Sequence, residues 1–435
     1  MNSGMELKRY KLGECFRMIK NGAVIQQRKQ AGGVPITRIE TLSNGKFNRD
    51  RLGYADIYDS QLYADYILED NDLLMSHINS REFLGRTVLY KWEEGEEIIH
   101  GMNLLRIKTE PSILDPTYAY YLFQTTYFKK LIESIRKDAI NQSSLAISDI
   151  CSLAMDLPSI PVQKGIASAL SVLDLKISNN IAINHYLEAM AKQLYDYWFV
   201  QFDFPDENGK PYKSSGGKMV WNDKLKREIP EGWSAKSINE ITVCVRGVSY
   251  DKSDLLNDRT GVLVLRGNNI QDNKLVYDNN VAFIPRTLIS QDQAIKKGDI
   301  IMTMSSGSKE HVGKCAYFHK DCFHTYGAFL NKYRAIENHS MLLFSFMSSP
   351  VFKGTIKNIC NGTGINNLTN QNFDSVYMPC PNTAILKKYN ANITPLFEKI
   401  GNLDAEIEML NIKRDELLPL LMTGQVSVKQ LNNDL

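Results

Sequence analysis

The chain has 435 residues, enough for two or three domains of ordinary size. Its 43% hydrophobic and 23% charged residues are typical of a folded globular protein and exclude the disordered and fibrous classes. The formal net charge is only +2, so any surface for nucleic acid must come from local placement of basic residues rather than from bulk charge.

The cysteines and histidines form no pattern that predicts metal or redox chemistry. None of the seven cysteines belongs to a C-x-x-C pair, so we expect buried free thiols. The seven histidines are scattered without an H-E-x-x-H motif, which gives a metal site no support. No apolar run approaches the roughly 18 residues of a membrane span, and the N-terminus lacks an apolar signal core, which favours a cytoplasmic protein without a membrane partner.

Residues 1–158 are predicted to form a mixed α/β domain. Apolar runs such as Asp72–Ser76, bounded by Gly, Asn and Ser turns, predict strands, and Tyr118–Arg136 predicts a helical stretch. The segment Asp115–Tyr118 resembles the D-P-P-Y motif of amino-methyltransferases, but its third position is wrong. We therefore expect no methyltransferase site in this domain.

Residues 159–200 predict a long helix with a heptad seam, because apolar and asparagine positions follow alternating steps of three and four. Asn180 and Asn184 would either fix the register of a helix pair at some cost in stability or mark a wet end. The seam positions are Leu170, Leu173, Ile177, Asn180, Asn184, Leu187, Ala191, Leu194 and Trp198.

Residues 201–228 are dense in Pro, Gly and polar residues and predict an extended connector. Ile229–Trp233 then opens a second domain, residues 229–381. Trp233 is expected either to close the base of this domain against the long helix or to be an ordinary core residue.

The second domain repeats the first, which is the strongest signal in the sequence. The repeat continues into residues 382–435, a second helix with a tail and a seam of the same spacing. The matched segments are Val34–Arg38 with Val262–Arg266, Asp72–Ser76 with Asp299–Thr303, Gly85-Arg86 with Gly313-Lys314, and Arg106 with Arg334. The second seam reads Ile393, Leu396, Ile400, Leu403, Ile407, Leu410, Arg414, Leu417 and Leu421.

Two seams of equal length can close on each other. Each covers about 28 residues, so a helix pair would be about 42 Å long. The alternative is that each helix packs separately on its own domain.

Two Gly-containing segments of the second domain are not cofactor loops. Gly307–Cys315 has the wrong spacing for a phosphate loop and a Cys where Mg²⁺ ligation needs Ser or Thr. Gly362–Asn367 lacks the third glycine of a dinucleotide fingerprint. With the methyltransferase motif also incomplete, we expect no catalytic site in this chain.

The order of several short motifs within this repeat resembles the specificity subunits of type I restriction-modification systems, over essentially the whole chain. The N-terminal Met5–Gly13 departs from the family's complete Pro-x-Gly-Trp entry, which leaves the docking of the N-terminus open. The motifs are Ile160–Lys164, Leu187–Leu194, Tyr197–Phe199, Phe202–Pro205, Pro211–Lys213, Gly216-Gly217, Met219-Val220, Ile229–Trp233 and Lys413–Val426.

The resemblance implies an α/β (α+β) protein with two target recognition domains separated by an antiparallel two-helix coiled coil and related by an internal pseudo-two-fold repeat. Each domain would read one half of a bipartite, asymmetric site on double-stranded DNA. A rod of about 42 Å can bridge the roughly 34–36 Å between successive major-groove faces.

The same resemblance implies the partners. Two modification (methyltransferase) subunits would bind, through the helices, and two restriction (translocase and nuclease) subunits would join them. S-adenosylmethionine, ATP and Mg²⁺ would be used by those partners, with no cofactor in this chain.

Direct reading of bases needs Arg, Lys, Asn or Gln on loops, and the chain offers several. For any one of them, an ordinary solvated loop is an equal alternative. For Arg38 and Arg266 the structural alternative has more weight, because a repeated Arg at a strand end can pair with a repeated acid. The candidates are Lys20, Asn21, Gln27, Arg28, His77, Asn79 and Arg81 in the first domain, and Arg246, Tyr250, Asn268, Asn269, Ser306, Lys309, Thr363 and Asn366 in the second.

Two other functions stay open from the residues. One is a two-lobed assembly scaffold that binds proteins but not DNA. The other is a silent copy of a specificity subunit that serves only in recombination.

Overall fold

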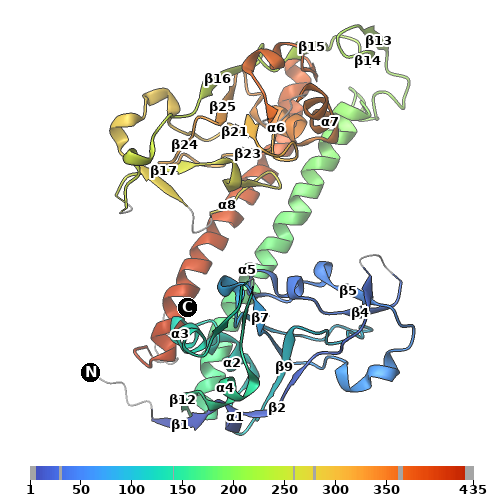
Figure 1. Cartoon of the computed structure of the whole chain (residues 1–435). Helices are drawn as coiled ribbons and strands as arrows, with labels where there is room; N and C mark the ends of the chain where they lie inside the picture. The colour runs from blue at the N-terminus through green and yellow to red at the C-terminus, as the bar shows by residue number, and fades with distance from the viewer. Residues whose placement is uncertain are drawn as a thin grey trace. The chain divides into compact units, whose positions relative to one another are not determined.

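The computed structural model of the chain describes residues 6–28, 32–140, 142–257, 260–277, 281–360 and 366–426. It separates into two compact units, Met1–Ser178 with Glu408–Leu435, and Asn179–Ile407. Each unit contains one globular domain and part of each long helix, α5 (Ile160–Tyr195) and α8 (Thr383–Met422) (Figure 1).

The first domain is built on a four-stranded antiparallel sheet of order β2-β9-β6-β8. All four residues of β6 are buried, because it is an inner strand with both faces covered. Its apolar side chains pack against two short helices and the first turns of α5. The strands are β2 (Phe16–Asn21), β9 (Leu104–Thr109), β6 (Leu73–Ser76) and β8 (Thr87–Leu89), and the helices are α2 (Pro116–Leu122) and α3 (Thr126–Ser134).

The predicted helical stretch at 118–136 is two helices rather than one. Asp115 begins α2, since its Oδ1 accepts hydrogen bonds from the backbone N–H groups of Thr117 (3.0 Å) and Tyr118 (2.9 Å). Thr125 caps α3 through the backbone N–H of Phe128 (3.2 Å). The segment that resembled a methyltransferase motif is therefore a helix N-cap followed by proline, a common helix start.

Smaller elements complete the first domain. An antiparallel pair of β1 (Leu7–Lys11) with β12 (Ala154–Pro158) leads directly into α5. The remaining strands form the sheets β3-β5-β4 and β10-β11-β7. Their bounds, with those of the short helices, are β3 (Gln27–Arg28), β4 (Val34–Ile36), β5 (Gly53–Ala55), β7 (Ile78–Asn79), β10 (Lys137–Asp138), β11 (Ser143–Ser144), α1 (Leu12–Cys15), α4 (Ile147–Ser152), η1 (Ile39–Gly45), η2 (Arg49–Arg51), η3 (Ser60–Tyr66) and η4 (Arg81–Phe83).

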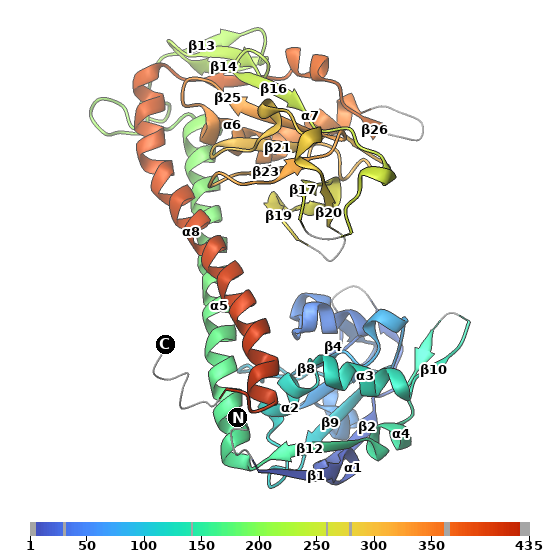
Figure 2. The same ribbon diagram turned by 90° about the vertical axis from the view of Figure 1, so that its left-hand side faces the viewer.

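The second domain has the corresponding sheet, of order β16-β25-β21-β23. Helix α6 packs on β21, β23 and β25, and α7 packs on α6 (Figure 2). The bounds are β16 (Thr242–Arg246), β25 (Leu330–Ala335), β21 (Asp299–Thr303), β23 (Cys315–Tyr317), α6 (Ser340–Ser348) and α7 (Pro350–Ile359). The other elements are β13 (Met219–Asn222), β14 (Arg227–Pro230), β15 (Ser234–Ser237), β17 (Val262–Leu265), β18 (Ile270–Gln271), β19 (Lys274–Leu275), β20 (Ala282–Ile284), β22 (Ser305–Ser306), β24 (Thr325–Tyr326), β26 (Asn366–Asn367), β27 (Tyr377–Cys380), η6 (Lys252–Asp254), η7 (Gly267–Asn269), η8 (Arg286–Leu288), η9 (Gln291–Gln293) and η10 (Asn370–Asp374).

The internal repeat is confirmed in the central sheet and in the strand pairs around it. In each domain an antiparallel pair, β1-β12 or β15-β27, carries the chain towards a long helix. In each domain a two-residue strand, β7 or β22, follows the buried strand β6 or β21 and pairs with a short strand near the C-terminal end of the domain. Both domains therefore share the topology of these strands, as a tandem duplication requires, although the hairpin β18-β19 of the second domain corresponds to η1 in the first.

One detail of the predicted repeat is wrong, because Arg106 does not correspond to Arg334. Ser76 pairs with Leu104, and its counterpart Thr303 pairs with Leu330. Counting along the strands from these pairs, Arg106 corresponds to Lys332. The sheet register thus shifts the sequence alignment by two residues.

Within each unit, α5 and α8 run side by side in opposite directions (Figures 1 and 2). In the first unit, Arg414 donates from Nη1 to Oδ1 of Asp174 at 3.0 Å. In the second, Asn184 donates from Nδ2 to Oδ1 of Asp404 at 2.7 Å, and Asn180 donates to Glu406 at 3.0 Å. From Asn180 to Asn184 on α5, the partner on α8 moves back along the chain from Glu406 to Asp404. The two helices therefore run antiparallel, and the predicted helix pair is confirmed.

Asn180 and Asn184 are buried within the helix pair rather than at a wet end. None of the ten principal seam positions is exposed. Leu173, Ile177, Asn184, Ile400 and Leu410 are buried, and Leu187, Leu194, Leu396, Ile407 and Leu417 are half-buried.

The helix ends also belong to the domain cores, but the alternative that each helix packs separately on its own domain is wrong, because each core contains residues of both helices. The first turns of α5 and the last turns of α8, with Leu170 and Leu421, join the core of the first domain. Trp198, in the helical turn that directly follows α5, and Tyr389 on α8 pack together in the core of the second, with ring centroids 5.7 Å apart. Each domain is therefore fixed to both helices in its own unit.

The segment after α5 is more ordered than the predicted extended connector. A π-helical turn, Asp196–Val200, ends the helix, and residues 219–230 contain the hairpin β13-β14. Trp233 stacks on Phe204 (5.1 Å) and packs against Phe199 (5.3 Å) at the end of α5. It therefore closes the base of the second domain against this helix.

All seven cysteines lie among the described residues. Four cysteines are buried and three, at positions 151, 244 and 322, are only half-buried; all seven are free thiols.

Among the described residues, the helix at Ile160–Val200 is long and apolar enough to cross a membrane by length and composition, with 33% of its most apolar stretch buried. A helix that packs in a protein core passes the same test.

Candidate DNA interface

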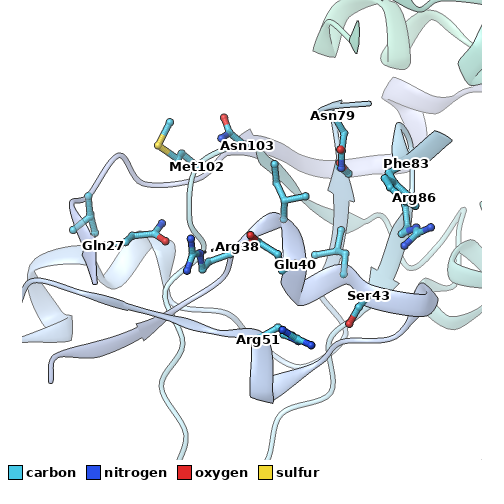
Figure 3. A pocket seen from close by; sticks show the side chains of 14 residues that line it. Gln27, Arg38, Glu40, Ser43, Arg51, Asn79, Phe83, Arg86, Met102 and Asn103 are labelled. Atoms are coloured by element: carbon cyan, nitrogen blue, oxygen red, sulfur yellow. Dashed lines mark hydrogen bonds and ion pairs between the residues drawn. The ribbon is translucent and has the colours of Figure 1, made fainter. Parts of the chain in front are cut away.

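The first domain carries an open pocket of about 770 Å³ (Figure 3). It lies where the residues between β3 and η2 face the ends of β6, β7 and the loop before β9. Cationic and amide side chains share it with apolar ones. The lining residues are Ile25, Gln27, Arg38, Ile39, Glu40, Leu42, Ser43, Arg51, Ser76, Asn79, Phe83, Arg86, Met102 and Asn103.

Three guanidinium groups line this pocket, and their partners differ. Arg38 forms an ion pair with Glu40 at 3.7 Å. The guanidinium of Arg86 lies 4.3 Å from the ring centroid of Phe83. Among the described residues, neither Arg51 nor Arg86 has an ion pair with an acid. Desolvation lowers the pKa of Arg86, partly offset by the nearby charge of Glu82, which marks a cation partly withdrawn from water.

Three amide side chains complete the polar lining. Asn79 donates from Nδ2 to the hydroxyl oxygen of Ser76 at 3.0 Å, while its Oδ1 accepts from the backbone N–H of Ser80 at 2.8 Å. Asn103 has a φ of 70°, a left-handed conformation that Asn tolerates better than most residues. Gln27 lies on β3. Guanidinium and amide groups are the side chains that pair with guanine and adenine edges, so the pocket has the chemistry of a base-reading surface.

The structure places the first-domain candidates at several separate positions. Gln27 and Asn79 line the pocket. Asn21 is exposed at the end of β2, and Lys20 beside it donates to the backbone carbonyl of Asp65. Arg28 forms an ion pair with Asp56 at 2.8 Å, and Arg81 forms one with Glu133.

His77 is a poor candidate for a base contact, because its side chain is buried and 7% exposed. Burial lowers the pKa of its imidazole, which favours the neutral form. The sequence prediction for His77 therefore conflicts with its position. His77 directly follows β6, so the sequence predicted a loop there. A loop prediction does not indicate whether the side chain is buried.

Sequence reasoning missed the three guanidinium groups of the pocket and one of its amides. Arg38 was interpreted mainly as a structural residue, and Arg51, Arg86 and Asn103 were not proposed. Arg86 had a usable signal, because the Gly85-Arg86 pair recurs as Gly313-Lys314. Arg51 and Asn103 had none, since only the chain fold brings η2 and the loop before β9 to the same pocket.

In the second domain, Arg266 and Tyr250 come together. The Nε group of Arg266 donates to the hydroxyl of Tyr250 at 3.0 Å, so its partner is a phenol rather than the expected acid. Arg246 donates to the backbone carbonyl of Ala328 at 3.4 Å. Ser306 lies on β22, and Lys309 is exposed in the following loop.

Asn269 is a structural residue of this domain rather than a surface reader. It is 1% exposed, its Nδ2 donates to the carbonyl of Val276 at 2.9 Å, and its Oδ1 accepts from the N–H of Arg266 at 2.9 Å. The backbone carbonyl of its neighbour Asn268 accepts from the side chain of Gln271 at 3.1 Å. Thr363 lies outside the described residues, and for Asn366 only the backbone, on β26, is described.

The thiols are unsuited to nucleophilic chemistry. Burial raises the pKa of Cys315 to about 12 and, with the charge of Glu14, that of Cys15 to about 11. Burial also raises the pKa of Cys380 to about 11. These thiols stay protonated at neutral pH, whereas a reactive cysteine needs a lowered pKa.

Comparisons with known proteins agree with the duplicated fold. The family model described as the type I restriction modification DNA specificity domain matches residues 5–189 and 230–410, one match for each half of the repeat. A protein of Methanocaldococcus jannaschii, provisionally named the type I restriction enzyme MjaX specificity subunit, is 28% identical over 96% of this chain and 93% of its own length.

Two further comparisons differ in coverage. The type I restriction enzyme EcoKI specificity subunit of Escherichia coli K12 is 31% identical over 42% of this chain and 40% of its own length. The crystal structure of the type I restriction-modification S subunit from M. genitalium is similar in fold, with a TM-score of 0.60, 16% identity and 97% coverage of both chains. Because the family model covers most of the chain in two successive matches, the protein belongs to the family of type I restriction-modification DNA specificity subunits.

Proposed function

We propose that this chain selects the DNA sequence for a type I restriction-modification complex, with each of its two domains reading one half of a bipartite, asymmetric site. The observation that carries the proposal is that two domains with the same central sheet differ in the residues at equivalent positions of corresponding strands and loops. Asn79 on β7 corresponds to Ser306 on β22. Asn103, which precedes β9, corresponds to Phe329, which precedes β25. Equal scaffolds with unequal surface residues are what two different half-sites require.

We propose further that the chain is not catalytic and works in the cytoplasm with partner subunits. Two modification subunits would bind the helices and supply S-adenosylmethionine and methyl transfer. Two restriction subunits would supply ATP-driven translocation and Mg²⁺-dependent cleavage. The high pKa values of its buried thiols and the helix-capping role of Asp115 support a chain without its own transfer chemistry.

The decisive experiment expresses the chain with its modification subunits in a host that lacks other adenine methylation and sequences the methylome. The expected result is one methylated motif with two short specified parts separated by unspecified bases. A single continuous motif, or no motif in a complex that assembles normally, would contradict the proposal.

A second measurement separates DNA reading from a scaffold role. The chain alone is expected to bind DNA weakly, and the assembled complex is expected to bind a duplex with the methylated motif far more tightly than an unrelated duplex. A complex that forms but has equal, weak affinity for both duplexes would favour the assembly scaffold.

A further inference from the structure

Two kinds of DNA contact are expected in each domain, one to the phosphate backbone and one to the bases. Two half-sites differ in their bases but share the same phosphate backbone, and phosphate contacts carry no direct sequence information. A surface cation kept at equivalent positions of both domains is therefore suited to the backbone. Positions where the two domains differ are suited to the bases.

One repeated cation, Arg86 in the first domain and Lys314 in the second, occupies the same local structure. The N–H of Ser76 donates to the carbonyl of Arg86 at 2.9 Å, and the N–H of Thr303 donates to that of Lys314 at 2.9 Å. In each hairpin, the preceding glycine donates back to Ser76 or Thr303 at 2.8 Å.

The preceding glycines show why this hairpin is the same in both domains. Gly85 has a φ of +75° and Gly313 a φ of +81°, a region that favours glycine. A Cβ on Gly85 would lie 2.8 Å from Ile132 on α3, and one on Gly313 would lie 2.9 Å from Ile356 on α7. The turn is thus fixed against equivalent helices, and the next residue is held at a fixed place.

The side chains at this place contact an aromatic ring in one domain and an imidazole in the other. Arg86 lies over the ring of Phe83 and lines the pocket of the first domain. Lys314 has its Nζ 3.2 Å from Nδ1 of His311. Neither forms an ion pair with an acid among the residues that the structure describes, so both cations can meet an anion from outside.

The Arg-to-Lys difference argues for a phosphate rather than a base. A planar guanidinium fork reads a guanine edge with two hydrogen bonds in a fixed plane, whereas a lysine ammonium contacts the same edge with a different geometry, so the two are not interchangeable at one base. A phosphate accepts either group, because it needs chiefly the positive charge. Nearby positions behave differently, since Asn21 at the end of β2 corresponds to Arg246 at the end of β16.

We propose that Arg86 and Lys314 are equivalent, sequence-independent contacts to the DNA backbone, one for each half-site. This inference rests on the proposed function and extends it, because it assigns these two residues to affinity rather than to specificity. The occupant is a backbone phosphate beside the bases that each domain reads.

The test uses the full chain assembled with its modification subunits. Affinity is measured for a duplex with the complete site and for an unrelated duplex, over a range of salt concentrations. Arg86→Ala and Lys314→Ala are each expected to weaken binding to both duplexes by about five-fold near 0.15 M salt and to reduce the slope of log K against log salt by about 0.9. The methylated motif should not change.

Two variants control the interpretation. Arg86→Lys should bind nearly as well as the wild type, because it retains the charge. Arg9→Ala removes an equal charge from the exposed strand β1, where Arg9 lies 3.5 Å from Asp156, and should leave the salt slope unchanged. Thermal unfolding of each variant shows whether it is folded.

Several outcomes would overturn the inference. A motif altered in one half-site by Arg86→Ala would make Arg86 a base contact. Unchanged affinity and salt slope in a folded Arg86→Ala complex would make the residue structural only. Failure of the proposed function looks different, because the wild-type complex itself would then show no preference for its site.

Discussion

Asp72 and Arg106 form an ion pair of 2.7 Å inside the first domain, and both side chains are at most 2% exposed. The second domain has a corresponding buried aspartate, but the positions of the arginine and the lysine beside it are exchanged. There the buried Asp299 lies 3.8 Å from the buried Lys332 and 2.7 Å from the half-exposed Arg334. The facing strand thus reads Arg-x-Lys in β9 and Lys-x-Arg in β25, so that a basic residue is buried beside the aspartate in both domains.

The buried pair should be strongly coupled, since each charge compensates the other where water is excluded. Arg106→Met alone is expected to lower the free energy of unfolding of the first domain by about 3–5 kcal/mol, because it leaves a buried carboxylate. The double variant Asp72→Asn with Arg106→Met should cost clearly less than the sum of the two single variants. Denaturant unfolding measures all three, and simple additivity would contradict the coupling.

His100 should make the first domain sensitive to acid. Its side chain is fully buried, its Nε2 lies 2.9 Å from the carbonyl oxygen of Leu104, and burial lowers its pKa from 6.5 to about 3. The folded domain holds His100 as the neutral imidazole, so its contribution to stability is fully present above pH 6.5. This contribution is lost as the pH falls towards 3, because in that range only the unfolded chain takes up the proton. About 2 kcal/mol should be lost between pH 7 and pH 5 from this group.

The pH dependence is measured by thermal unfolding of the wild type and of His100→Gln at both pH values. The variant should lose that share of the pH dependence, whatever its stability at pH 7. His185→Gln, at an exposed position of α5, is the matched control and should retain the wild-type dependence. Equal pH dependence in the wild type and His100→Gln would show that His100 does not carry the effect.

Asn103 and Phe329 should specify different half-sites. They precede equivalent strands, yet one is an amide in the pocket and the other an aromatic ring that is 68% exposed. Asn103→Ala is expected to relax discrimination at one base position of one half-site by about 1–3 kcal/mol, and Phe329→Ala should act only in the other half-site. Methylome sequencing reports both, and a change in both half-sites from either variant would contradict the assignment.

Asn184 is expected to lower the stability of the helix pair and to fix its register. Its Nδ2 donates to Asp404, but its buried Oδ1 has no hydrogen-bond partner among the described residues. Asn184→Leu is therefore expected to raise the free energy of unfolding by about 1 kcal/mol, since Asp404 is exposed and can be hydrated instead. Chemical unfolding checks the sign, and a destabilised Leu variant would show that the Asn–Asp hydrogen bond dominates.

Long-range features of this protein were readable from the sequence wherever their signal was periodic or duplicated. The heptad steps in α5 and α8 predicted the helix pair, because each seam repeats every three to four residues along one helix. The duplicated segments predicted two domains of one topology, and Trp233 in its motif was correctly placed against the end of α5 as one of two alternatives.

Only the tertiary structure decided which residues meet. Arg106 was matched to Arg334 because both strands carry two basic residues, two positions apart, and only the hydrogen-bonding register identifies Lys332 as its counterpart. Asn269 and His77 read as loop residues, although each is buried. The pocket joins Arg38, Arg51, Arg86 and Asn103 through the order of the strands. A sequence states what each residue can bind, but side-chain neighbours are set by strand order and register, which depend on packing across the whole domain.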